Sequence, residues 1–471
     1  MSYTRSSLLK KPKQNELPRD ISQIYNIAGF DVTKRENLIS LDGTNCLYIA
    51  GNSIVTYNML TKKRSYVFGL DGEGIGCFCM HPSNSLIAIG EQGLKPNIYI
   101  CEYPSFDIKH VCKEGTERGY SSMDFSADGE KLSSVGQSPD FLLTVWDYKN
   151  ERTLLHTKAF GQDVFKVAFS KDNDGRLTTS GTGHIRFWQM AATFTGLKLQ
   201  GEIGKFGKLD LSDVDAFVEL PDSKVVSGSE TGYLLLWEGN FVKCRFVTSS
   251  KSPEIMFDGS VSPRSQGTVF GDTPAHVGGV FVIIHDRENN QIISAGADGK
   301  IKWWSFTAID LAEVDSDISM DFPLKLKKEL LVGEGVCVKT MTKKGDTGNW
   351  LIEDSNGGVF DVNEAADPPQ ISKKWDFHAG SIVGVDSSAV DHYAVTAGAD
   401  GRVKLWDYIN KKVIMTAENK VGCSTVTAVP KNVDEEGRTW AVGFEDGVVR
   451  CFYRGDGEEL QLRQVTVSVS K

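Results

Sequence analysis

The chain has 471 residues, 40% of them hydrophobic and 24% charged, which is the composition of a globular protein that can bury a large core in a few domains or in one repeat ring. Its net charge of −10, with no basic stripe along the body of the sequence, argues against a nucleic-acid-binding surface. No run of about 18 apolar residues occurs, so we expect no membrane span.

The first 23 residues are a short basic stretch. Five basic residues outweigh Glu16 and Asp20, so the first 20 residues carry a charge of +3. We interpret the stretch as a solvated, disordered tail; the alternative is contact with an acidic surface such as tubulin. It lacks the apolar core of a secretory signal, so we expect the protein to stay inside the cell. The five basic residues are Arg5, Lys10, Lys11, Lys13 and Arg19.

The nine cysteines are scattered and odd in number, which fits reduced thiols better than a disulfide framework. Cys77 and Cys79 would lie on one face of a strand, but no second Cys pair and no His pair accompanies them, so we predict no metal site. Gly204–Lys208 combines glycine and lysine without the spacing of a phosphate-binding loop, and we expect no cofactor. The sequence contains no sustained heptad repeat, so we expect no coiled coil.

From residue 24 onward the chain divides into nine β-rich units, each closing on an apolar or aromatic strand that follows a Gly or Asp turn. Their period is roughly 40 to 50 residues. The first unit has a hairpin signal at Gly51, and the third, fourth and fifth units close on Trp146, Trp188 and Trp237. The seventh and ninth units are degenerate, with phenylalanine in place of the closing tryptophan.

The sixth and eighth units carry nearly identical segments at 296–304 and 398–406. In each, a histidine stands 28 residues and a hydroxyl residue ten residues before the closing tryptophan. A repeat that keeps His, Ser/Thr, Asp and Trp in register resembles the WD repeat, the four-stranded blade of a β-propeller. The predicted fold is therefore all-β, a WD40-type β-propeller with nine blade-like four-stranded units. The predicted tetrads are His276, Ser294, Asp298 and Trp304, and His378, Thr396, Asp400 and Trp406.

The same residue types also build a nucleophilic triad. In a blade, however, the indole N–H can donate to the hydroxyl, the hydroxyl to the imidazole, and the imidazole N–H to the carboxylate, so that no buried polar group is left unpaired. Thr396 is an uncommon nucleophile but an equally good bridge. We therefore predict that both tetrads are structural and that no residue is catalytic.

Other units lose the tetrad, and we expect strand packing and apolar burial to hold them instead. Counting back from the closing tryptophan, the Asp and His positions are occupied in the fourth unit by Thr182 and Phe160, and in the fifth by Thr231 and Leu209.

Two long connections interrupt the repeat, at 248–275 and 311–332. The first is rich in Ser, Gly and Pro, and the second has three aspartates followed by three lysines. Insertions longer than about 12 to 15 residues carry function or are disordered. We interpret each connection either as a partner contact or as flexible surface.

The most distinctive sequence segments lie in the second to fifth units, at 95–105, 157–165, 178–188 and 190–208. Together these stretches resemble the amino-terminal WD region of the cilia- and flagella-associated protein 44 family, over about 24–452. The resemblance implies a non-enzymatic scaffold of the motile cilium or flagellum axoneme, and hence a cytoplasmic, cytoskeletal location. The implied role is in the tether that links an inner-arm dynein to the doublet microtubule, beside the related cilia- and flagella-associated protein 43.

The nine units allow two arrangements. Seven could close a propeller over 24–377, after the tail at 1–23, with two further units at 378–470 beginning a second propeller. One large ring would instead leave no blade edge unpaired. The architecture of the resembled family, which continues into further blades and a coiled coil, favours seven plus two.

Two other functions stay open at this point. The chain could be a general cytosolic WD-repeat adaptor unrelated to cilia, or a propeller enzyme that uses a carboxylate cluster or a metal in its central channel. We expect protein partners, namely a related WD-repeat protein, inner-arm dynein and the doublet microtubule, and neither nucleic acid nor membrane.

Overall fold

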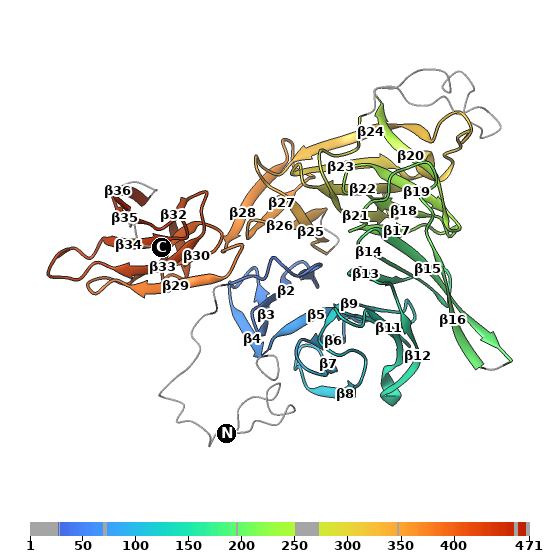
Figure 1. Cartoon of the computed structure of the whole chain (residues 1–471), viewed down its shortest axis with the longest axis horizontal. Coiled ribbons are helices and arrows are strands. Elements are labelled where there is room, and N and C mark those ends of the chain that lie inside the picture. Colours follow the sequence, from blue (N-terminus) through green and yellow to red (C-terminus); the bar gives the residue numbers. More distant parts are fainter. Residues whose placement is uncertain are drawn as a thin grey trace. The chain divides into compact units, whose positions relative to one another are not determined.

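The computed structural model describes residues 27, 29–68, 73–194, 196–249, 273–345, 348–455 and 460–467. The predicted tail at 1–23 and most of the connection at 248–275 lie outside these residues. Within them the regular secondary structure is almost entirely β-strand, with one short α-helix, α2 (Phe306–Asp310), and one 3-10 helix, η1 (Tyr148–Asn150) (Figure 1).

The first four sheets each contain four antiparallel strands that follow one another in chain order. Several strands, such as 86–91 and 142–147, are nearly continuous apolar runs because both of their faces are covered by neighbouring sheets. The strands are β1 (Leu38–Ser40), β2 (Asn45–Ala50), β3 (Ser53–Asn58) and β4 (Arg64–Phe68); β5 (Ile75–Met80), β6 (Leu86–Glu91), β7 (Ile98–Glu102) and β8 (Ile108–Cys112); β9 (Tyr120–Phe125), β10 (Leu132–Gly136), β11 (Leu142–Asp147) and β12 (Arg152–Lys158); β13 (Val164–Phe169), β14 (Arg176–Gly181), β15 (His184–Thr193) and β16 (Gly196–Ile203).

The fifth and sixth sheets are joined into one sheet of eight strands, because their outer strands β20 and β24 pair in parallel. The prediction that 311–332 is a connection between repeat units is therefore wrong for 321–331, which form β24. The strands are β17 (Phe217–Glu219), β18 (Val225–Gly228), β19 (Leu234–Glu238) and β20 (Phe241–Ser249); β21 (Val280–Asp286), β22 (Gln291–Gly296), β23 (Lys300–Ser305) and β24 (Asp321–Leu331).

The last three sheets again have four strands each in chain order. They contain β25 (Val338–Lys343), β26 (Asn349–Asp354), β27 (Gly358–Asn363) and β28 (Gln370–Asp376); β29 (Ile382–Ser387), β30 (Tyr393–Gly398), β31 (Arg402–Asp407) and β32 (Lys412–Glu418); β33 (Cys423–Ala428), β34 (Thr439–Phe444), β35 (Val448–Arg454) and β36 (Leu460–Val467).

The chain divides into two compact units. Of the residues that the structure describes, the first unit contains those within 33–354 and 360–372, and the second contains those within 20–32, 355–359 and 373–471. Within the first unit the first and seventh sheets meet, where the backbone N–H of Ser40 donates to the Thr342 hydroxyl at 3.2 Å. Figure 1 shows the sheets of this unit following one another from β2–β4 (blue) round to β25–β27 (orange). The division of the chain at residue 377 stays a prediction.

The core lies between successive sheets and not inside any one of them. From the first sheet to the seventh, each successive pair shares a buried apolar cluster, such as the one between the fifth and sixth sheets around Leu236 and Trp304. In the second unit, Leu405 and Trp440 belong to the cluster between the eighth and ninth sheets. Burying each such side chain is worth about 1.5 to 3 kcal/mol. Packing between the faces of neighbouring sheets therefore holds the strands in position, including the strand ends where the tetrad residues lie.

Candidate functional site

The sixth sheet brings its four predicted residues together at one end. His276 precedes β21, Ser294 lies on β22, Asp298 is in the turn before β23, and Trp304 lies on β23. Trp304 Nε1 donates to Ser294 Oγ at 2.8 Å, and that oxygen lies 2.7 Å from His276 Nε2. His276 Nδ1 lies 2.9 Å from Asp298 Oδ1. Since Ser294 Oγ accepts from the indole, its own proton points to Nε2, and Nδ1–H donates to the carboxylate.

The turn of the sixth tetrad depends on Gly299. Its φ of +68° belongs to the left-handed region, and a Cβ there would stand 2.7 Å from the backbone oxygen of Val336. The turn aims the Asp298 carboxylate at three donors, because the backbone N–H groups of Val277 and Lys300 also donate to it, each at 3.2 Å. Burial alone would raise the pKa of Asp298, but these hydrogen bonds, led by His276, hold that pKa below its usual value.

The eighth sheet repeats this geometry within the second unit. Trp406 Nε1 donates to Thr396 Oγ1 at 2.7 Å, and His378 Nε2 lies 2.8 Å from the same oxygen. His378 Nδ1 lies 3.1 Å from Asp400 Oδ1, and the backbone N–H of Ala379 donates to Oδ2 at 2.8 Å. Burial opposes ionisation of Asp400, yet the bonds from His378 and Ala379 lower its pKa.

The hydroxyl and imidazole groups of both tetrads are buried. Ser294 is fully buried and His276 is 1% exposed, so the hydroxyl has no open side on which a substrate could lie. In both tetrads the hydroxyl oxygen lies between the indole N–H and imidazole Nε2. This arrangement can join two strands, the turn between them and the segment that precedes the first strand of the sheet, and its hydroxyl oxygen is hydrogen-bonded on both sides.

Three further sheets keep half of the tetrad. Trp146, Trp188 and Trp237 each donate from Nε1 to a hydroxyl of the second strand of their sheet, at 2.8 to 2.9 Å. Counting ten residues back misses two of these partners because the turn between the second and third strands is two residues longer in the third sheet and one residue shorter in the fourth than in the sixth, so the spacing becomes 12 and 9 residues. The acceptors are Ser134, Thr179 and Ser227.

The third sheet has a variant that sequence reasoning missed. Thr116 stands where a histidine would, and its hydroxyl donates to Asp140 at 2.9 Å. The backbone N–H of Glu117 donates to the second carboxylate oxygen at 3.0 Å. Asp140 stands six residues before Trp146, as Asp298 stands six before Trp304, and that offset was the available signal.

The fourth sheet replaces the His–Asp pair with a stack. Phe160, at the position of the histidine, lies face to face with His184, with 3.8 Å between the ring centroids. His184 Nδ1 lies 3.2 Å from the backbone oxygen of Thr182, at the position of the aspartate. Burial lowers the pKa of His184, which favours the neutral ring.

A charged cluster inside the ring was also missed. Arg35, just before β1, donates to Asp215 Oδ1 at 2.9 Å, and its guanidinium lies 3.7 Å from the centre of the Phe165 ring. Glu36 accepts from Lys166 Nζ at 2.6 Å. The first sheet neighbours the second and seventh sheets, so these contacts with the fourth and fifth reach across the inside of the ring.

Asp124, on the inner strand β9, belongs to the same region. Its Oδ2 accepts from the backbone N–H of Phe169 at 2.8 Å. Burial raises the pKa of Asp124 to about 7, and the negative charge of Glu36 adds to the increase, against the opposing Phe169 bond.

The thiols and the other potential metal ligands of the described residues form no cluster. All nine cysteines are free thiols, and burial raises the pKa of Cys77 to about 12. The described residues contain no group of three or more His, Cys, Asp or Glu side chains that could hold a metal ion. Over the same residues, no helix is long and apolar enough to cross a membrane.

The fold and the tetrads define a WD-repeat β-propeller protein. A family model described as "Echinoderm microtubule-associated protein first beta-propeller" matches residues 72–344, and one described as "WD domain, G-beta repeat" matches residues 370–407. The first match covers more than half of the chain. The chain therefore belongs to the family of the echinoderm microtubule-associated protein first β-propeller, and the predicted WD40-type β-propeller fold is confirmed.

Full-length relatives support a more particular likeness. The chain is 38% identical to cilia- and flagella-associated protein 44 of Mus musculus, over 93% of this chain and 23% of that protein. It is 38% identical to the protein of that name from Chlamydomonas reinhardtii, over 92% and 24%, and 32% identical to that of Trypanosoma brucei brucei, over 83% and 23%. The predicted resemblance is confirmed. The chain spans about a quarter of the length of these relatives.

Proposed function

We propose that this chain is a non-enzymatic WD-repeat scaffold of the axoneme of motile cilia and flagella. The observation that carries the proposal is the 32–38% identity, over 83–93% of this chain, to cilia- and flagella-associated protein 44 from three distant organisms. Membership of a family named after a microtubule-associated protein agrees with a cytoskeletal location. The proposed location is the axoneme in the cytoplasm of the cilium, on the doublet microtubule.

The non-enzymatic part of the proposal rests on the geometry of the tetrads. The hydroxyl groups that a triad would need as nucleophiles are buried and hydrogen-bonded in both sheets. A catalytic serine needs an exposed oxygen beside a group that stabilises an oxyanion. The chain would instead act by rigid presentation, because loops fixed by packed sheets can dock a partner at little cost in ordering.

We further propose that its partners are other axonemal proteins: a related WD-repeat protein, an inner-arm dynein and the doublet microtubule, in the tether that links the last two. The broader partner class, proteins bound through a propeller, agrees with the WD-repeat match.

The test is fractionation of a tagged chain expressed in ciliated cells. After detergent removes the membrane, we expect the chain in the axoneme pellet, measured by quantitative mass spectrometry against a tagged propeller of unrelated function. Crosslinking in the pellet should then join the chain to an inner-arm dynein heavy chain. A chain found wholly in the detergent-soluble fraction, like the control, would favour the general cytosolic adaptor.

A further inference from the structure

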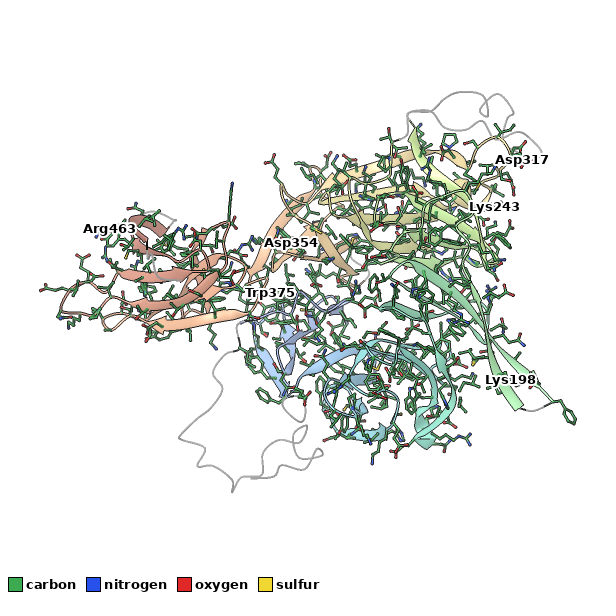
Figure 2. The ribbon with its side chains drawn as sticks, in the orientation of Figure 1. Lys198, Lys243, Asp317, Asp354, Trp375 and Arg463 are labelled. Atoms are coloured by element: carbon green, nitrogen blue, oxygen red, sulfur yellow. The ribbon has the colours of Figure 1, made fainter. Side chains whose placement is uncertain are left out.

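The hairpin of β15 and β16 is longer than the sheet needs. Its two strands pair continuously from Arg186 with Ile203 out to Thr193 with Gly196. Figure 1 shows the ends of both strands (green) extending beyond the other strands of the first unit, and Figure 2 labels Lys198 on the extending part.

A local hydrogen bond joins the two strands near the tip of the hairpin. The hydroxyl of Thr193 donates to the backbone oxygen of Gly196 at 2.7 Å, and Gly196 has a φ of +110°, which the turn needs and glycine adopts freely. Because the base of the hairpin belongs to a packed sheet, the arm avoids the marginal stability of an isolated hairpin.

One face of the hairpin is an apolar stripe that leaves the core. It starts at Trp188, which is 2% exposed, and continues through the half-buried pair of Met190 and Leu199. Beyond that pair Leu197 is 43% exposed, and Phe194, near the tip, is fully exposed. Single exposed apolar residues are ordinary on a protein surface, but a stripe continuous with the core that ends in a bare aromatic ring marks an interaction site.

The charge of the arm limits the kind of partner. Between Gln189 and Gly201 the only ionisable side chain is Lys198, whereas 24% of the whole chain is charged. One lysine is too little for an anionic surface such as a nucleic acid or the acidic face of a microtubule. An exposed phenylalanine on a stiff, almost uncharged arm fits an apolar pocket in another protein, where aromatic anchors supply most of the binding free energy.

We propose that the β15–β16 arm is a docking element whose Phe194, with Leu197 beside it, inserts into an apolar pocket of a protein partner in the axoneme. This inference rests on the proposed function for the location of the partner. It assigns a role to the stretch 190–201, which lies in the part of the sequence that most resembles the ciliary family.

The experiment measures binding of the full 471-residue chain to demembranated axonemes from cells that lack their own relative of this chain. The test variants are Phe194→Ala and a shortened arm, in which 192–197 are replaced by Asn-Gly so that a two-residue turn joins Ala191 to Lys198. The control is Leu60→Ala, which removes another exposed apolar side chain of the first unit. Thermal melting checks that every variant is folded.

We expect Phe194→Ala to weaken binding by about 10- to 100-fold, the loss that removing one buried aromatic ring produces. The shortened arm should lose at least as much, and Leu60→Ala should bind within about twofold of the wild type. The ratio between wild type and Phe194→Ala should stay constant from about 50 mM to about 300 mM salt, because an apolar contact is not screened.

If wild type and both arm variants bind axonemes equally well, the docking role is overturned while the proposed function stands. If the wild type itself does not bind, the proposed function fails and the docking role fails with it. Arm-dependent flotation with phosphatidylcholine–phosphatidylserine vesicles would overturn the protein pocket in favour of a lipid surface.

Discussion

The sixth and fourth sheets share one four-stranded plan but treat their buried polar groups differently. The sixth links Trp304, Ser294, His276 and Asp298 in a chain of hydrogen bonds. The fourth keeps only the bond from Trp188 to its hydroxyl and fills the remaining positions with the stack of Phe160 on His184. It also carries the long arm. The two copies most alike in sequence therefore carry the complete set of hydrogen bonds, and individual features arise where the repeat has decayed.

The largest expected effect is on the complete tetrad. His276→Ala leaves the Asp298 carboxylate and the Ser294 hydroxyl buried without their shared partner, and it should cost about 3 kcal/mol of unfolding free energy. Trp304→Phe removes one donor and some buried area and should cost about 1 kcal/mol or more. Both should lower the melting temperature measured by calorimetry, whereas the exposed His156→Ala should not. An unchanged melting temperature in both tetrad variants would contradict the prediction that the tetrad has a structural role.

The equivalent change in the fourth sheet should cost less. His184→Ala removes a buried ring that stacks on Phe160, with no carboxylate left behind, so about 1 to 2 kcal/mol is expected. Chemical denaturation of the His184→Ala and His276→Ala variants gives the two losses in unfolding free energy, which can be compared directly. If His184→Ala cost as much unfolding free energy as His276→Ala, the aromatic stack would stabilise its sheet as much as the tetrad does, and the expected difference between the two sheets would be wrong.

The same contrast explains what could be predicted from sequence. His276 and Trp304 recur at fixed offsets in a second copy, because a hydrogen-bonded set tolerates few residue types, and this periodicity was enough for the fold. Arg35 and Asp215 are 180 residues apart and occur once, so no pattern links them. The strand at 321–331 was missed because its charged residues suggest a loop and its parallel pairing with β20 depends on tertiary structure.

Asp124 should give the chain a pH dependence opposite in sign to that of the tetrad carboxylates. Its folded pKa is raised to about 7 from an ordinary 3.8, so the folded state binds more protons than the unfolded state between these values. Stability due to this group is then lost as pH rises through that window. Asn keeps the side-chain oxygen that accepts from Phe169, so Asp124→Asn should be more stable than wild type at pH 8, by on the order of 2 kcal/mol.

At about pH 4 the Asp124→Asn variant and the wild type should unfold at nearly the same denaturant concentration. Asp298 and Asp400 have lowered pKa values, so their contribution is present above the ordinary carboxyl range and is lost on acidification. A stability difference between the Asp124→Asn variant and the wild type that is constant from about pH 4 to about pH 8 would contradict titration of this carboxyl.

The smallest effect is expected inside the ring, at Arg35. Its side chain is 43% exposed, so its ion pair with Asp215 is screened by water, and Arg35→Met should cost less than about 1 kcal/mol. Arg287 is a matched control, because it pairs with Asp172 at similar exposure. The Phe165 ring under the Arg35 guanidinium distinguishes the first pair, so a double-mutant cycle of Arg35→Met with Phe165→Leu should give a coupling of about 0.5 to 1 kcal/mol. A coupling free energy of zero would mean that Arg35 forms only an ordinary surface ion pair with Asp215. The contact of Arg35 with the Phe165 ring would then add nothing to the stability of the ring of sheets.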